Sequence, residues 1–182
     1  MKRAAFLDLN GTLVLPIKPE SLGELTLIEN ATQAVARLSH AGLLCPVVTV
    51  QSRISKGIFS LEEFQQWFKS FADDLRRSGA VVLGPYVCPH RFREPCPCKK
   101  PATFLYEQAA SDNGIDLQQS FVIGDSVEDV CAARQFGGQG CLVRTGRAEN
   151  PSVVERASPY SSFVAESLGA AVDWILNRLD SR

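Results

Sequence analysis

Carboxylates follow apolar runs at two distant points of the chain. The stretch AAFLDLNGTLV, residues 4–14, rises through apolar residues to Asp8 and then breaks into a Gly-Thr turn, and VIGDSVEDV, residues 122–130, carries Asp125 and Asp129. Acidic groups that converge from separate strands form a hard oxygen site suited to Mg²⁺. Such a cation lets a carboxylate act on an anionic phosphate ester that it would otherwise repel. The pattern therefore predicts metal-assisted phosphoryl chemistry.

Groups that could hold a phosphate lie close to these carboxylates in sequence or at the end of another strand. Gly11 allows a tight turn whose backbone N–H groups can face phosphate oxygens, and Thr49 and Ser52 offer hydroxyls to the same group. Thr12 and Gln51 are further candidates for phosphate or substrate binding.

Four soft ligands are concentrated in CPHRFREPCPC, residues 88–98. Three thiolates and an imidazole suit a closed tetrahedral Zn²⁺ site, although the one-residue gaps are tighter than the usual finger spacing. Free surface thiols or a redox pair are the alternatives. The candidate ligands are Cys88, His90, Cys96 and Cys98, whereas the remaining cysteines are expected to be buried thiols, namely Cys45, Cys131 and Cys141.

These residues need a scaffold, and the hydrophobic pattern predicts one of alternating strands and helices. Strands are expected at 4–9, 44–50, 80–83, 120–124, 140–144 and 163–165, and helices at 30–41, 60–78, 102–111, 127–136 and 168–179. This alternation predicts an α/β fold with a mostly parallel sheet covered on both faces, in which ligands bind at the carboxyl ends of the strands. The aromatic stripe of 60–78 is expected in the core, and 146–162 is expected to be a long surface loop.

Composition favours one globular domain over residues 1–182. The chain is 45% hydrophobic with a formal net charge of -1, so there is no global reason to expect a nucleic-acid or membrane partner. The apolar start is too short for a signal peptide, and no segment reaches the length of a membrane span. We expect a monomeric, cytoplasmic protein.

The order of the motifs resembles the haloacid dehalogenase (HAD) superfamily of phosphatases over about residues 4–145. Its features are Asp-x-x-Gly-Thr, a strand ending in Thr, a Lys before Pro, and Gly-Asp-x-x-x-Asp. The resemblance implies a three-layer Rossmann-like fold with no large cap domain. It also implies that Asp8 is the nucleophile, that Thr49 binds and Lys100 neutralises the phosphoryl group, that Asp125 binds Mg²⁺, and that Asp129 orients the metal site or the lysine.

The loop 88–98 and the stretch VTVQSRISKG resemble a narrower branch, that of the D,D-heptose 1,7-bisphosphate phosphatases and histidinol phosphatases. This resemblance favours zinc over the alternatives and implies that the metal fixes Lys99 and Lys100 over the phosphate. It predicts a Mg²⁺-dependent phosphatase with a small phosphorylated metabolite as substrate, such as D-glycero-D-manno-heptose 1,7-bisphosphate or histidinol phosphate.

The chain departs from the superfamily pattern at Asn10, where these phosphatases usually have an aspartate that acts as general acid and base. Asn10 still supplies the backbone carbonyl that binds Mg²⁺ in this family, but its side chain cannot transfer a proton, which is worth roughly 10²–10⁴ in rate. A natural low-activity enzyme, a proton from Glu20 or the substrate, and a deliberate substitution are the open explanations.

The substrate loops also depart from the heptose branch, at Val50, Arg53 and Ser126. These differences speak against heptose bisphosphate, while Arg53, Lys56 and Lys99 are candidates to bind a second anionic group or are solvated charges. The rival functions are a pseudoenzyme that binds a phosphorylated ligand or partner and a nucleic-acid 3′-phosphatase, which the absence of a basic stripe disfavours.

Overall fold

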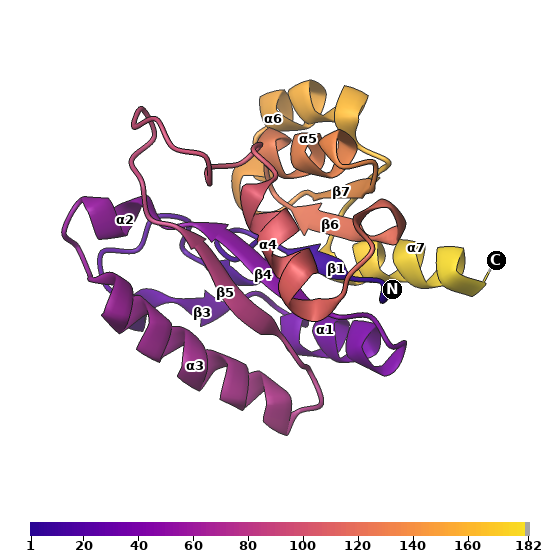
Figure 1. The fold of residues 1–182 in the computed structure, drawn as a ribbon, viewed down its shortest axis with the longest axis horizontal. Helices are drawn as coiled ribbons and strands as arrows, with labels where there is room; N and C mark the ends of the chain where they lie inside the picture. Colours follow the sequence, from indigo (N-terminus) through magenta and orange to yellow (C-terminus); the bar gives the residue numbers. More distant parts are fainter. Residues whose placement is uncertain (181–182) are drawn as a thin grey trace.

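A six-stranded sheet forms the centre of the computed structural model, which describes residues 1–180 (Figure 1). The strand order is β5-β4-β1-β6-β7-β8, and every neighbouring pair is parallel. The strands are β1 (Ala5–Leu7), β4 (Pro46–Val50), β5 (Leu83–Cys88), β6 (Phe121–Gly124), β7 (Gln139–Val143) and β8 (Phe163–Ala165). The predicted α/β class with a mostly parallel sheet is confirmed.

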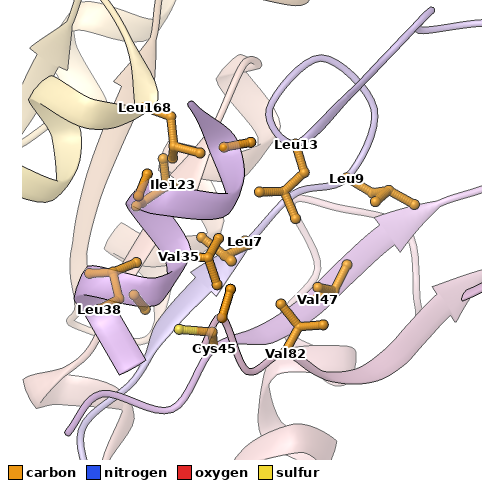
Figure 2. Packing of buried hydrophobic residues seen from close by; sticks show 14 of the residues in the cluster. Leu7, Leu9, Leu13, Val35, Leu38, Cys45, Val47, Val82, Ile123 and Leu168 are labelled. Atoms are coloured by element: carbon orange, nitrogen blue, oxygen red, sulfur yellow. The ribbon is translucent and has the colours of Figure 1, made fainter. Parts of the chain in front are cut away.

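Helices cover both faces of this sheet because each strand sends alternate side chains to opposite sides. Leu7 of β1 belongs to one buried cluster, together with residues of α1 (Ala31–His40), α3 (Leu61–Arg77) and α7 (Leu168–Asp180). Phe6 belongs to a second cluster, with residues of α4 (Phe104–Asn113) and α5 (Val127–Gln135). Figure 2 shows the first cluster around Leu7, with Val35 and Leu38 of α1 packed over the sheet. The three layers expected from the sequence are present.

Helix α3 begins with a capping box. The Ser60 hydroxyl accepts the N–H of Glu63, and the Glu63 carboxylate accepts the N–H of Ser60. Phe64 and Phe68 are buried, which confirms that the aromatic stripe is core, but Leu61 at the first turn remains 39% exposed.

Other elements differ from the predictions. β5 begins at Leu83 and runs to Cys88, so residues 80–82 are not strand and the predicted strand 80–83 is misplaced. A Gly-Pro pair inside β5 interrupts the apolar pattern, and Pro85 is tolerated because β5 is an edge strand.

Asn30 stands at the N-cap of α1, but its φ of 61° places it in the left-handed region and its side chain makes no capping hydrogen bond.

The segment 146–162 is not a loop, which corrects that prediction. It contains η3 (Gly146–Glu149), α6 (Pro151–Ala157) and η4 (Ser158–Tyr160), because Asn150 caps a helix whose first residue is proline. The short elements missed by the pattern are β2 (Val14–Leu15), η1 (Leu22–Glu24), β3 (Thr26–Leu27), α2 (Ser52–Ser55) and η2 (Leu117–Gln119).

Cys45 and Cys141 are buried as expected, whereas Cys131 is only partly buried. Among residues 1–180, no helix has the length and apolar character needed to cross a membrane.

Candidate functional site

Asp8 lies directly after β1, at the carboxyl edge of the sheet. Its N–H donates to the carbonyl of Ile123 on the neighbouring strand β6 at 2.9 Å, which anchors the residue at the strand end. The Lys100 ammonium donates to Asp8 Oδ1 at 2.7 Å and to Asp129 Oδ1 at 2.7 Å. All three residues are buried, so residues far apart in sequence meet in one ion-paired cluster.

The electrostatics of this cluster depend on burial and on the neighbouring charges. Burial raises the pKa of Asp8, and the nearby positive charge of Lys100 opposes that rise. Burial alone would lower the pKa of Lys100, but the carboxylates of Asp129 and Asp8 raise it well above its usual value. Lys100 therefore stays protonated and provides a fixed positive charge beside Asp8.

Asp125 follows β6 and is completely buried. Its Oδ2 accepts the backbone N–H of Arg147 at 2.7 Å, and its Oδ1 accepts the guanidinium Nη1 of Arg147 at 3.0 Å. Burial and the nearby Asp8 raise the pKa of Asp125 to about 7, while Arg147 acts in the opposite direction. Carboxylate oxygens of Asp8, Asp125 and Asp129 lie within 4.8 Å of one another, which is a donor set suited to a hard cation.

Ser126 orients the third carboxylate. Its hydroxyl donates to Asp129 Oδ2 at 2.5 Å, and its backbone N–H donates to the same oxygen at 3.2 Å. Since Oδ1 of Asp129 already accepts Lys100, both oxygens of this side chain are engaged. Asp129 is thus placed to hold the lysine and the start of α5.

Two glycines allow the loops around the carboxylates to approach closely. Gly11 has φ +95°, and a Cβ there would lie 2.1 Å from Asp125 Oδ2. Gly146 has φ +55°, and its Cβ would lie 2.5 Å from Gly11 Cα. The Thr145 hydroxyl donates to the carbonyl of Gly11 at 2.6 Å, so the segment after β7 is joined to the loop that follows Asp8.

The side chain of Asn10 is held at both ends of its amide. Asn10 Nδ2 donates to the carbonyl of Pro16 at 3.1 Å, and Gln51 Nε2 donates to Asn10 Oδ1 at 2.7 Å. Gln51 Nε2 also donates to Thr49 Oγ1 at 2.9 Å. Gln51 therefore links the end of β4 to the loop after β1, and Thr49, Gln51 and Asn10 meet as their sequence positions suggest.

Thr12 and Ser52, two further predicted phosphate-binding residues, differ in burial. Thr12 is fully buried, and its hydroxyl has no hydrogen-bond partner among the described residues. Ser52 is partly buried at the first position of α2. A role of these two residues in phosphate binding stays a prediction.

Arg53 and Lys99 are engaged in intramolecular contacts. Arg53 Nη2 donates to Glu20 Oε1 at 2.5 Å and to the carbonyl of Lys18 at 3.1 Å, so Glu20 is paired with a cation. Lys99 Nζ donates to backbone carbonyls of the 88–98 loop, those of Phe92 at 2.8 Å, Glu94 at 2.9 Å and Arg91. The structure thus places the Lys99 ammonium against the loop, whereas the sequence predicts it over the phosphate.

The four predicted zinc ligands converge between the end of β5 and Lys100. Cys88 Sγ lies 3.7 Å from Cys96 Sγ and 3.5 Å from His90 Nδ1, and His90 Nδ1 lies 3.2 Å from Cys98 Sγ. Tetrahedral zinc with ordinary bond lengths separates two sulfurs by about 3.8 Å and a sulfur from a nitrogen by about 3.6 Å. The cluster is close to these spacings and fits zinc.

Arg147 and Glu94 take part in these sites but carry no motif that would mark them in the sequence. Arg147 lies in the segment expected to be a loop, so nothing in the sequence places it on Asp125. Glu94 Oε1 lies 3.8 Å from His90 Nε2, the ring nitrogen opposite the one that faces the thiols. An i to i+4 spacing of Glu94 after His90 was the only available signal.

Comparisons with known proteins agree with this geometry. A family model described as "HAD-hyrolase-like" matches residues 97–171. A D-glycero-beta-D-manno-heptose-1,7-bisphosphate 7-phosphatase of Haemophilus ducreyi is 37% identical over 158 residues, covering 81% of this chain and 86% of the relative. The D-glycero-D-manno-heptose-1,7-bisphosphate 7-phosphatase of Thermosynechococcus vestitus is 32% identical over 194 residues. This alignment covers 98% of this chain and 98% of the relative.

A solved structure is also similar over nearly the whole chain. It is the D,D-heptose 1,7-bisphosphate phosphatase of B. bronchiseptica in complex with magnesium and phosphate, with a TM-score of 0.86 and 27% identity. The match covers 97% of this chain and 99% of that structure.

Proposed function

Since the chain belongs to the HAD-like family of phosphoric monoester hydrolases that includes the heptose 1,7-bisphosphate 7-phosphatases, we propose that it hydrolyses a sugar phosphate through Asp8. The observation that carries this proposal is the buried contact of Lys100 with both Asp8 and Asp129, next to Asp125. A carboxylate beside a fixed cation and a candidate metal site is the arrangement that aspartyl-phosphate chemistry requires.

Magnesium is the metal that we propose for the carboxylate site. The residues that would hold it are Asp8 and Asp125 through carboxylate oxygens and Asn10 through its backbone carbonyl, an all-oxygen set that fits Mg²⁺. The related solved structure contains magnesium and phosphate, which supports the assignment. When bound, the ion supplies positive charge to the transferring phosphoryl group.

The residues of the chain itself carry the proposed chemistry. A carboxylate oxygen of Asp8 attacks phosphorus, the bond from phosphorus to the substrate oxygen breaks, and an aspartyl phosphate and an alcohol result. Lys100 neutralises negative charge near the attacked group, and the Thr49 hydroxyl binds a phosphoryl oxygen. Water then attacks the aspartyl phosphate, which releases inorganic phosphate and regenerates the Asp8 carboxylate.

Asn10 slows both steps in this proposal. The alcohol must gain a proton as it leaves, and the attacking water must lose one, but an amide does neither. Glu20 is a poor substitute because Arg53 holds it in an ion pair. The protons are then exchanged with solvent or substrate groups, and turnover falls by roughly 10²–10⁴ relative to a matching aspartate enzyme.

Zinc has a structural role in the proposal. Burial raises the pKa of the Cys88 and Cys98 thiols, so a bound cation is needed to keep both as thiolates. The ligands end at Cys98, and Lys100 follows two residues later. A closed zinc site therefore fixes the chain directly before the catalytic lysine.

The relatives indicate which substrate to test first. The names of the curated relatives specify heptose 1,7-bisphosphate and its 7-phosphate. We therefore propose this sugar bisphosphate as the leading substrate, which revises the expectation drawn from Val50, Arg53 and Ser126, with histidinol phosphate second. Arg53 and Lys99 already have intramolecular partners, so we do not assign them to the second phosphate. A cytoplasmic location and a monomeric state remain predictions.

The experiment is phosphate release with Mg²⁺ from heptose 1,7-bisphosphate, histidinol phosphate and an aryl phosphate. The Asp8→Asn variant is compared with Asp73→Asn, which makes the same change on the exposed face of α3. We expect slow release that Asp8→Asn abolishes and Asp73→Asn preserves. Equal turnover by both variants would contradict the nucleophile assignment.

A second candidate function is binding without turnover, and the contacts of Asn10 favour it. Both ends of its amide are hydrogen-bonded, so the chain provides a stable pocket for a neutral side chain at this position. A pseudoenzyme would bind phosphate in the presence of Mg²⁺ and release none from any substrate. Calorimetry with inorganic phosphate beside the release assay separates the two functions.

A further inference from the structure

Arg147 lies on the carboxylate that the proposed magnesium site needs most. Its Nη1 donates to Asp125 Oδ1 at 3.0 Å and is 3.4 Å from Oδ2, and its backbone N–H donates to Oδ2 at 2.7 Å. Asp125 has no exposed surface, so this pairing neutralises a carboxylate that cannot be solvated. The guanidinium is therefore an integral part of the site.

The backbone places Arg147 there by a close approach of two loops. Thr145 donates to the Gly11 carbonyl at 2.6 Å, and Gly11 and Gly146 pack so tightly against each other and against Asp125 that neither position accepts a Cβ. Arg147 directly follows Gly146, so its backbone N–H lies beside Asp125. Its side chain, however, is 45% exposed, so the guanidinium has space to move into solvent while Asp125 does not.

The charges around the site explain why a movable cation is useful. The three carboxylates of Asp8, Asp125 and Asp129 face two cations, Lys100 and Arg147, so the cluster carries one net negative charge when all are ionised. Lys100 is buried between two carboxylates and is fixed. Arg147 is the partner that a dication would displace, because both need the oxygens of Asp125.

We propose that Arg147 is a displaceable counter-ion, which occupies Asp125 before magnesium binds and competes with Mg²⁺ for this carboxylate. The inference rests on the proposed magnesium site. Arrival of Mg²⁺ and release of Arg147 change the cluster from one net negative charge to no net charge, and they leave a guanidinium at the rim of the site. The anionic substrate is then attracted only after the metal has bound.

The test is calorimetric titration of Mg²⁺ into the zinc-loaded protein, with no substrate present. We expect Arg147→Met to bind Mg²⁺ at least about tenfold more tightly than the wild type, since one nearby positive charge is removed. Arg147→Lys keeps the charge, and its affinity should return toward that of the wild type.

Arg144→Met is the matched control, because Arg144 also lies near the end of β7, is 46% exposed and pairs with Glu166 at 3.1 Å. Its magnesium affinity should equal that of the wild type. Weaker or unchanged binding by Arg147→Met would overturn the inference and leave Arg147 as a structural support for Asp125.

The outcomes separate this inference from the proposed function. No magnesium binding by the wild type or any variant would contradict the magnesium site itself. If Arg147→Met does not fold, the guanidinium resonances of Arg147 are followed by NMR in the wild type. They should shift on saturation with Mg²⁺, and an unchanged spectrum would overturn the competition.

Discussion

Replacing Asn10 with aspartate tests the most unusual position of the site. Asn10 is 5% exposed, its Nδ2 donates to the Pro16 carbonyl, and its Oδ1 accepts Gln51 Nε2. An aspartate of the same shape keeps the contact with Gln51. Toward Pro16, however, an ionised carboxylate would set two acceptor oxygens about 3 Å apart, whereas a protonated carboxyl group would donate as the amide does.

The pocket therefore favours the neutral form of the introduced carboxyl group. The loss of one hydrogen bond, replaced by repulsion in a buried site, costs about 2 kcal/mol. The pKa of this carboxyl group is then raised above its ordinary value, and the negative charge of Asp8 nearby acts in the same direction. A carboxyl group that is protonated near neutral pH is suited to protonate the leaving alcohol.

The sign of the stability effect follows from this shift. A carboxyl group whose pKa is raised in the folded state is harder to ionise there than in the unfolded chain. The free energy of unfolding therefore falls as the pH rises from the unfolded-state pKa to the folded-state pKa. Asn10→Asp should match the wild type at acidic pH and lose about 2 kcal/mol at alkaline pH, or roughly 4–8 °C in melting temperature for a chain of this size. Thermal unfolding across pH measures this difference.

The kinetic expectation is a gain of roughly 10²–10⁴ in turnover, or about 3–5 kcal/mol of barrier, with a pH optimum on the acidic side. Phosphate release by wild type and Asn10→Asp is compared across pH, with Asn113→Asp as a control amide on α4. A variant that gains no activity and melts at the wild-type temperature at every pH would refute the reasoning about Pro16.

Two further predictions concern the cations of the site. Lys100→Met should destabilise the protein by about 3–5 kcal/mol, measured by urea unfolding, because two buried carboxylates lose their partner, and stability equal to the wild type would show that the pair is dispensable. Removal of zinc by a zinc-selective chelator, with Mg²⁺ kept in excess, should abolish phosphate release before the helical content falls, and Cys98→Ser should show the same loss with less than one zinc per chain by metal analysis. Activity that survives full chelation would exclude this role for zinc.

Much of the site could be predicted because it follows from sheet topology. Asp8, Thr49 and Asp125 each stand at or just past the end of a parallel strand, and such ends share one edge. The thiols and imidazole of the candidate zinc site lie within eleven residues of sequence, which keeps them close in space. Strand order brings Asp8, Thr49 and Asp125 together, whereas the places of Lys100 and Asp129 and the preference for zinc came from the resemblance to known phosphatases.

The remaining features depend on three-dimensional contacts that no spacing encodes. The sequence shows that Arg53 and Lys99 are charged, but not that Glu20 and loop carbonyls engage them. Arg147 was missed because Asn150 and Pro151 look like loop residues, although a proline after a capping residue also begins a helix. The sequence shows which residues carry a charge, whereas the partners of these charges depend on the folded structure.

Within the 88–98 loop, the candidate metal ligands are constrained by their site, whereas the exposed tip is less constrained. The candidate metal ligands stand at its two ends, while Phe92 and Arg93 at the tip between them are exposed. Lys99 holds this tip through backbone carbonyls, which every amino acid supplies. Mutations of Phe92 and Arg93 can therefore accumulate in the segment that leads to Lys100 at little cost in stability, and they leave the proposed catalytic carboxylates in place.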